Sequence, residues 1–114
     1  MLPLPHAVNL LSALAQEHRL AVFRLLVKAG PQGLPAGVIA REVGARPNTL
    51  STHLAILDHA GLVSARREGR SVIYAANFGA MRDLLGFLVE DCCGGNPEIC
   101  APLAELARDC GACA

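Results

Sequence analysis

The stretch ARPNTLSTHLAILDHAGLVSARREGRSVIY, residues 45–74, decides how this chain folds. Pro47 or Asn48 opens a predicted helix, and Gly61 ends it. Apolar side chains recur in this helix at the spacing of one buried face: Leu50, Leu54 and Leu57. The opposite face is polar. The pattern therefore predicts an amphipathic helix whose polar face is free to meet a partner.

A basic hairpin follows this helix, with strands at residues 62–67 and 71–76 joined through residues 68–70. Helical periodicity predicts the other helices, at residues 6–16, 17–29, 35–43 and 78–91. Residues 1–5 and 32–34 are predicted to be irregular. The expected fold is mainly α with a small β-hairpin, in the order α-α-α-α-β-β-α, which is a winged helix-turn-helix.

The charge of the chain is divided along its length, although the formal net charge is zero. Residues 1–89 hold nine Lys or Arg against five Asp or Glu, a balance of +4. Residues 90–114 hold one Arg against five acids, a balance of −4. The basic part can approach phosphate while the acidic end stays away from it. With only 4% aromatic residues, a stacking platform for single-stranded nucleic acid is not expected.

Short hydrogen-bonding side chains gather near the start of the helix that opens at residue 47. They are Asn48, Thr49, Ser51, Thr52 and His53. A recognition helix uses such side chains to reach base edges and phosphates in the major groove. The hairpin adds cations that can lie along the DNA backbone: Arg66, Arg67 and Arg70. A solvated polar face, or a module that binds protein instead of DNA, is the alternative, and the basic hairpin argues against both.

These segments resemble the ArsR/SmtB family of metal-responsive bacterial repressors. The resemblance covers about residues 6–90 and is carried by LAQEHRLAVFRLLV (residues 14–27), NTLSTHLAILDHAGLV (48–63) and REGRSVIY (67–74). It implies a homodimer built from the first and last helices. It also implies two recognition helices set for a palindromic double-stranded operator, and repression that an inducer lifts.

Three cysteines follow the last predicted helix: Cys92, Cys93 and Cys100. Gly94 and Gly95 break the helix there, so the adjacent sulfurs can turn to one side. Three thiolates without a fourth ligand suit a soft, three-coordinate ion such as As(III) or Sb(III), whereas zinc prefers four ligands. A vicinal pair with a third Cys also resembles the arsenite-responsive branch of the family. Two further thiols, Cys110 and Cys113, could serve as accessory ligands.

Two interpretations of the thiols remain open. In the first, the protein is a repressor that As(III) or Sb(III) releases from DNA, with no cofactor needed for DNA binding. In the second, the same fold senses thiol oxidation or persulfides, because either member of the vicinal pair could form a disulfide with Cys100. An enzyme is not expected, because no His or Ser lies near the cysteines in sequence to act as a base.

The chain is thus expected to comprise a DNA-binding and dimerisation domain, residues 1–91, and a cysteine-rich inducer-binding tail, residues 92–114. No segment of the sequence is apolar over a length that spans a bilayer, and the N-terminus has no cationic region before an apolar run. Clustered thiols also favour a reducing compartment over a secreted disulfide framework. The predicted location is the cytoplasm.

Overall fold

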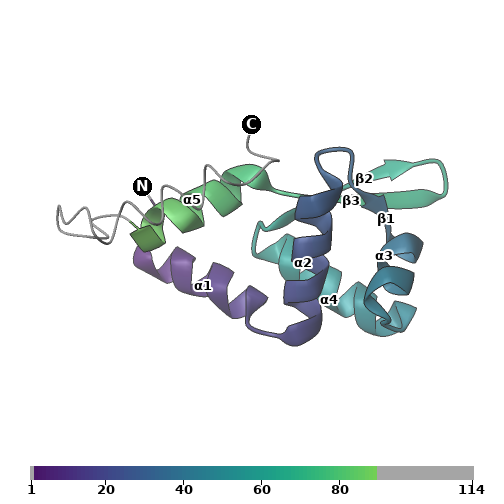
Figure 1. The fold of residues 1–114 in the computed structure, drawn as a ribbon, viewed down its shortest axis with the longest axis horizontal. Coiled ribbons are helices and arrows are strands. Elements are labelled where there is room, and N and C mark those ends of the chain that lie inside the picture. The colour runs from purple at the N-terminus through teal and green to yellow at the C-terminus, as the bar shows by residue number, and fades with distance from the viewer. Residues whose placement is uncertain (1, 90–114) are drawn as a thin grey trace.

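The computed structural model describes residues 2–89. Its elements are α1 (Leu4–Leu14), α2 (Glu17–Ala29), β1 (Leu34–Pro35), α3 (Ala36–Val43), α4 (Pro47–His59), β2 (Val63–Glu68), β3 (Ser71–Ala76) and α5 (Phe78–Val89). Figure 1 shows α1 and α5 together at one end, α2 in the middle, and the β2–β3 hairpin at the far end beside α3. The expected winged helix-turn-helix is confirmed.

The core is aliphatic and draws on every helix. Its fully buried side chains include Leu10, Val22, Leu26, Ile39, Leu50, Leu54, Leu57 and Leu62. Leu50, Leu54 and Leu57 are the stripe expected for the helix now seen as α4, and they fix its inner face. The outer face of α4 is thereby held toward solvent.

The sheet has three strands in the order β1-β3-β2, one more than the predicted hairpin. Residues 34 and 35, expected to be a connector and a helix start, instead pair with Tyr74 and Ile73 of β3. A two-residue strand gives no periodicity, and Pro35 fits it only because β1 is an edge strand. β1, which directly precedes α3, thus connects that helix to the hairpin.

The first helix begins earlier than the sequence predicted. Pro3 is its N-cap and Pro5 lies in its first turn, where a missing N–H costs nothing. The prolines expected to keep residues 1–5 irregular therefore start α1 instead of blocking it. No helix within residues 2–89 has the length and apolar character needed to cross a membrane.

The cysteine site predicted at Cys92, Cys93 and Cys100, with Cys110 and Cys113, lies outside the described residues. So does the proposed tail domain, residues 92–114. Within residues 2–89, His, Cys, Asp and Glu form no group of three that could hold a metal ion.

Candidate nucleic-acid interface

The turn between α3 and α4 is set by Gly44. Its φ of 70° and ψ of 31° are left-handed, a conformation that glycine adopts without a steric penalty. The Ala45 N–H donates to the Ala40 carbonyl at 3.1 Å, which closes the end of α3. Arg46 is extended and Pro47 occupies the first turn of α4. This short connection holds the two helices in a helix-turn-helix.

The first two turns of α4 present an exposed polar surface made of Asn48, Thr49, Ser51 and Thr52. The Thr52 hydroxyl donates to the Asn48 carbonyl at 3.3 Å, so its oxygen remains an acceptor. No side chain in the described part of the chain caps the N-terminus of α4. Its first backbone N–H groups, at Asn48 and Thr49, are therefore free to bind a phosphate. These four positions, with the helix start, form what we term the reading face.

His53 does not belong to the reading face, contrary to its assignment from sequence. Its side chain is only 9% exposed, and its ring stacks on His18 of α2 with centroids 5.7 Å apart. The Leu stripe sets the rotation of α4, and His53 lies on the buried side, beside Leu50 and Leu54. The polarity of residue 53 suggests an exposed side chain, but helical geometry places it inside. We therefore remove His53 from the predicted DNA contacts.

Burial lowers the pKa of His53 below its ordinary value of 6.5, and the nearby positive charges of Arg19 and His18 lower it further. Its buried Nδ1 atom has no hydrogen-bond partner within residues 2–89. The ring is therefore neutral at pH 7. It links the recognition helix to the start of α2 through packing rather than charge.

We expect acidification to destabilise the fold through His53. As pH falls below 6.5, the unfolded chain takes up a proton that the folded chain resists, so the free energy of unfolding decreases. The loss levels off once the pH is below the folded-state pKa. Urea unfolding at pH 7.5 and 5.5 measures it, and His53→Phe, which keeps a ring but cannot be protonated, should reduce the difference. His59→Phe, at an exposed histidine of the same helix, is the control and should leave the difference unchanged.

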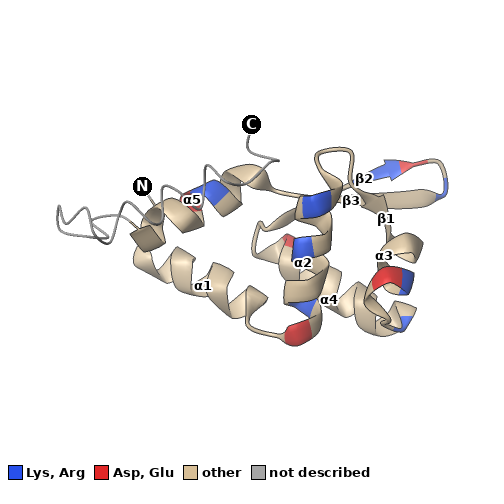
Figure 2. Ribbon diagram, viewed as in Figure 1, with Lys and Arg blue, Asp and Glu red and all other residues tan. Residues whose placement is uncertain are grey.

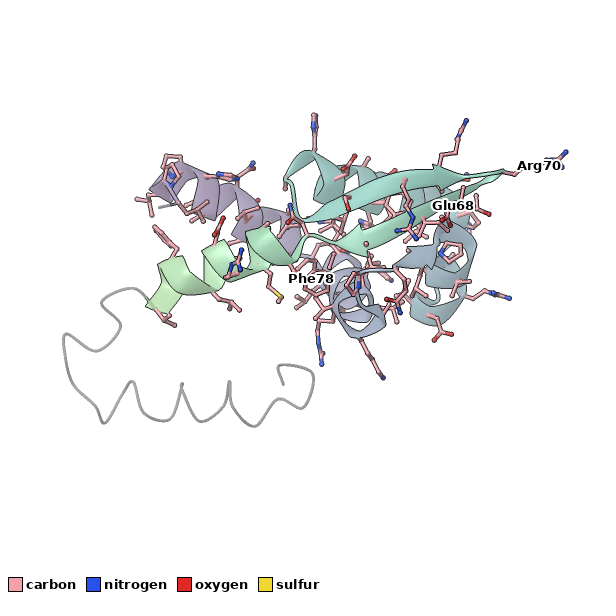
Figure 3. All side chains as sticks on the ribbon, turned by 90° about the horizontal axis from the view of Figure 1, so that it is seen from above. Glu68, Arg70 and Phe78 are labelled. Atoms are coloured by element: carbon pink, nitrogen blue, oxygen red, sulfur yellow. The ribbon has the colours of Figure 1, made fainter. Side chains whose placement is uncertain are left out.

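The wing is the β2–β3 hairpin, with Glu68 opposite Ser71 and Gly69-Arg70 between them. Gly69 has a φ of 62°, which the tight turn requires. Figure 3 shows Arg70 at the outer tip of the hairpin, directed away from the body. Arg70 and Arg67 are exposed and make no ion pair or side-chain hydrogen bond with other described residues. They are cations available to a phosphate backbone.

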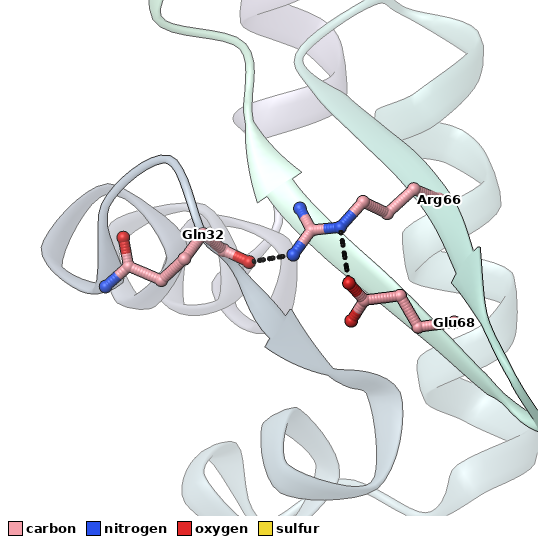
Figure 4. Close-up of polar contacts among 3 residues, drawn as sticks. All are labelled: Gln32, Arg66 and Glu68. Atoms are coloured by element: carbon pink, nitrogen blue, oxygen red, sulfur yellow. Dashed lines mark hydrogen bonds and ion pairs between the residues drawn. The ribbon is translucent and has the colours of Figure 1, made fainter.

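Arg66 was predicted to lie along the DNA backbone, but the structure pairs it within the protein. Its Nη2 donates to the Gln32 carbonyl at 2.7 Å, and its Nε lies 3.4 Å from a carboxylate oxygen of Glu68 (Figure 4). Arg66 opposes Ile73 in the sheet, so it points to the face opposite that of Arg67. It anchors the wing to the loop before β1. This partner is 34 residues away in the chain and leaves no local signal.

Positive charge lies along the wing and at the α3–α4 end, and α2 and α5 also carry cations, whereas α1 has no Lys, Arg, Asp or Glu (Figure 2). Arg46, the N-cap of α4, is exposed beside the reading face and was not among the residues predicted from sequence. Its position directly before Pro47 was the available signal, since that position flanks a helix N-terminus. The reading face and the wing together form a surface suited to a polyanion.

Comparison with known proteins agrees with this geometry. A family model described as a helix-turn-helix domain matches residues 14–65. The nodulation protein NolR of Rhizobium meliloti is 35% identical over 82 residues, which are 72% of this chain and 65% of NolR, just under two thirds. The transcriptional activator HlyU of Vibrio cholerae is 31% identical over 90 residues, 79% of this chain and 81% of HlyU.

Solved structures show the same architecture. Reduced HlyU from Vibrio cholerae superposes with a TM-score of 0.63 at 30% identity, covering 78% of this chain and 90% of HlyU. A homodimeric winged helix-turn-helix DNA-binding domain from Mycobacterium bovis, described as a possible ArsR-family regulator, gives a TM-score of 0.59 at 26% identity, covering 77% and 84%. None of these relatives is named as an enzyme. This chain therefore belongs to the ArsR/HlyU family of winged helix-turn-helix transcriptional regulators.

Proposed function

We propose that the protein is a homodimeric repressor that binds a palindromic double-stranded operator. The observation that carries this proposal is the reading face on α4 beside a wing whose Arg67 and Arg70 are exposed. In the proposed complex, α4 enters the major groove and the wing lies along the backbone or in the minor groove. Two such units related by a two-fold axis would match the two halves of a palindrome.

The dimer contact is proposed to use α1 and α5. These helices leave large apolar side chains exposed in the single chain, among them Leu4, Val8, Leu11, Leu88 and Val89. Burying them against a second copy would remove this apolar surface from water. The similar Mycobacterium bovis domain is homodimeric, which supports the proposal of a dimer.

Removing the charge at the wing tip should weaken DNA binding without changing which sequence is preferred. For Arg70→Gln we expect the affinity to fall by about the same factor for all DNA, and the slope of log K against log salt to shrink by about 1. Arg24→Gln is the matched control, because Arg24 is an exposed cation of α2 that lies outside both the reading face and the wing. Anisotropy titrations at several salt concentrations measure the affinity and its salt dependence for each variant. Equal losses for the two variants would contradict the assignment of Arg70 as the phosphate contact.

We further propose that trivalent arsenic or antimony is the inducer and that Cys92, Cys93 and Cys100 bind it. Three thiolates in nine residues around a Gly-Gly break match the pyramidal coordination of these ions. Ion binding next to the end of α5 would favour a dimer in which the reading faces no longer match the operator. Repression lifted by the ion follows from that shift.

The test is release of labelled operator from the fully reduced protein during an arsenite titration. We expect complete release at about one ion per subunit, because each subunit carries one three-cysteine site. Cys100→Ser should bind operator normally and lose most of the arsenite response. Cys113→Ser is the matched control and should respond like the unchanged protein. Full release of the Cys100→Ser protein by arsenite would refute the three-cysteine site.

A thiol-redox or persulfide sensor is the second candidate. It is favoured by one observation, that a solved structure of the related HlyU is specified as the reduced form. Oxidation joining Cys100 to Cys92 or Cys93 would then replace ion binding. Release of operator by a mild oxidant, together with no effect of arsenite in the presence of reductant, would select this function over the first.

A further inference from the structure

An apolar groove of about 570 Å³ runs between α2 and α5. Its walls include Leu20 and Phe23 from α2 and Met81, Leu84 and Leu85 from α5. Leu20 is 45% exposed and Leu85 is 53% exposed, so the groove is open to solvent within the described chain. This volume is within the range of clefts in which proteins bind other groups.

The rim of the groove is cationic. Arg24 and Lys28 of α2 line it, and both are exposed. Neither makes an ion pair with another residue among 2–89. A segment that fills the apolar interior and also pairs with the two rim cations therefore carries apolar side chains flanked by carboxylates.

The acidic end of the chain has this chemistry. Residues 102–108 read PLAELAR, and Leu103, Leu106 and Cys110 recur at helical spacing. Asp109 comes three residues after Leu106, so in a helix its carboxylate would border the apolar stripe. A second copy of α1 is a poorer match, because α1 has no acidic residue to meet Arg24 and Lys28.

The chain also leaves the described structure close to the groove. Leu85, a wall residue, is four positions before Val89, which is about 6 Å along a helix. The Gly-Gly-Asn-Pro sequence at 94–97 favours a reversal. The 13 positions from 89 to 102 can span far more than the length of α5, at about 3.3 Å per extended residue. Residues 102–108 can therefore run back along α5.

We propose that residues 102–110 dock in this groove of their own chain as an amphipathic helix, with Leu103 and Leu106 inside and Asp109 against Lys28. The covalent connection raises the effective concentration of the segment, so a short helix suffices. Docking requires neither DNA nor arsenite. If docking fails, the proposed function stands. If the proposed function fails, docking of the tail stands.

Lys28 is the only lysine in the chain, which makes a sharp test available. A carbodiimide joins the Lys28 amine to a carboxylate only when the two are in contact. In the full reduced chain, without DNA or arsenite, we expect a peptide linking Lys28 to a carboxylate within residues 98–109. The L103S/L106S variant should lower its yield at least about tenfold, because two buried leucines are lost. The control A101S/A112S alters two tail alanines and should keep the yield.

Two outcomes would overturn the proposal. The first is absence of the Lys28 link together with equal peroxide oxidation of Met81, a wall residue, in the unchanged and L103S/L106S proteins. The second uses a mixture of ¹⁴N and ¹⁵N protein. Linked peptides of mixed isotope would show that the segment binds the groove of a second copy instead. Peptides of single isotope, with faster Met81 oxidation in L103S/L106S, support docking within one chain.

Discussion

The Ser51→Glu variant is expected to lose operator binding by at least about 100-fold, which is about 2.7 kcal/mol. Ser51 lies on the reading face, in the second turn of α4 and next to Thr52. A carboxylate there would enter the groove between two rows of phosphates and replace a hydroxyl that can donate to a base. The loss combines like-charge repulsion with a missing base contact.

The fold should be unaffected by the same change. Ser51 is exposed, glutamate has a higher helix propensity than serine, and a negative charge in the first turns of a helix is favourable. Thermal unfolding of the variant should therefore match or exceed that of the unchanged protein. Ser12→Glu makes the same substitution at an exposed position of α1, among residues that face the C-terminal half of α4. Sedimentation should show that the Ser12→Glu protein keeps the oligomeric mass of the unchanged protein. Its affinity for operator should also be unchanged. Equal DNA affinity of the two variants would show that α4 does not enter the groove.

Most of the fold could be predicted from sequence because the helices obey one periodicity. The stripe of Leu50, Leu54 and Leu57 fixes α4, and Gly44 and Pro47 mark the turn before it. The predicted ranges of α2 and β3 coincide with the observed ones, Glu17–Ala29 and Ser71–Ala76. Where local residues decide an element, the sequence suffices.

The candidate interface could be predicted less completely, because two of its assignments depend on tertiary contacts. The polarity of His53 suggested exposure, but its place beside the Leu stripe buries it against His18. Arg66 belongs to a basic hairpin, yet a backbone carbonyl 34 residues away holds its guanidinium. For Arg66 the deciding partner lies on another element, so composition and spacing carry no record of it. For His53 the spacing from Leu50 and Leu57 was a signal of burial, which the polarity of the residue obscured.

The same holds for β1, which was missed although it completes the sheet. Its pairing with β3 brings the loop before it close to the wing, so that the Gln32 carbonyl can accept from Arg66. Gly33 lies between these two contacts, with a φ of 72°. The sequence shows only a Gly between polar and apolar residues, but the structure places it where an added Cβ would overlap the Tyr74 carbonyl oxygen.

Replacing Gly33 with alanine is expected to lower the free energy of unfolding by about 3–4 kcal/mol, which is large for a single added methyl group. A left-handed backbone costs an L-residue about 1–2 kcal/mol. The remainder comes from a collision, since the new Cβ would overlap the Tyr74 carbonyl oxygen and lie 2.9 Å from its carbon. Backbone cannot move aside as a flexible side chain can, so the β1–β3 pairing has to open.

Gly44→Ala separates the two contributions. Gly44 has a φ of 70°, within 2° of that of Gly33, but a Cβ there would meet nothing within 4 Å. It should therefore cost only the conformational part, about 1–2 kcal/mol. Urea unfolding of both variants at one protein concentration measures the difference. If both variants lose the same amount, the close approach of residue 33 to β3 does not exist in solution. If Gly33→Ala loses more, operator affinity should fall with it, because opening β1 releases Arg66 from the Gln32 carbonyl and frees the wing from the body.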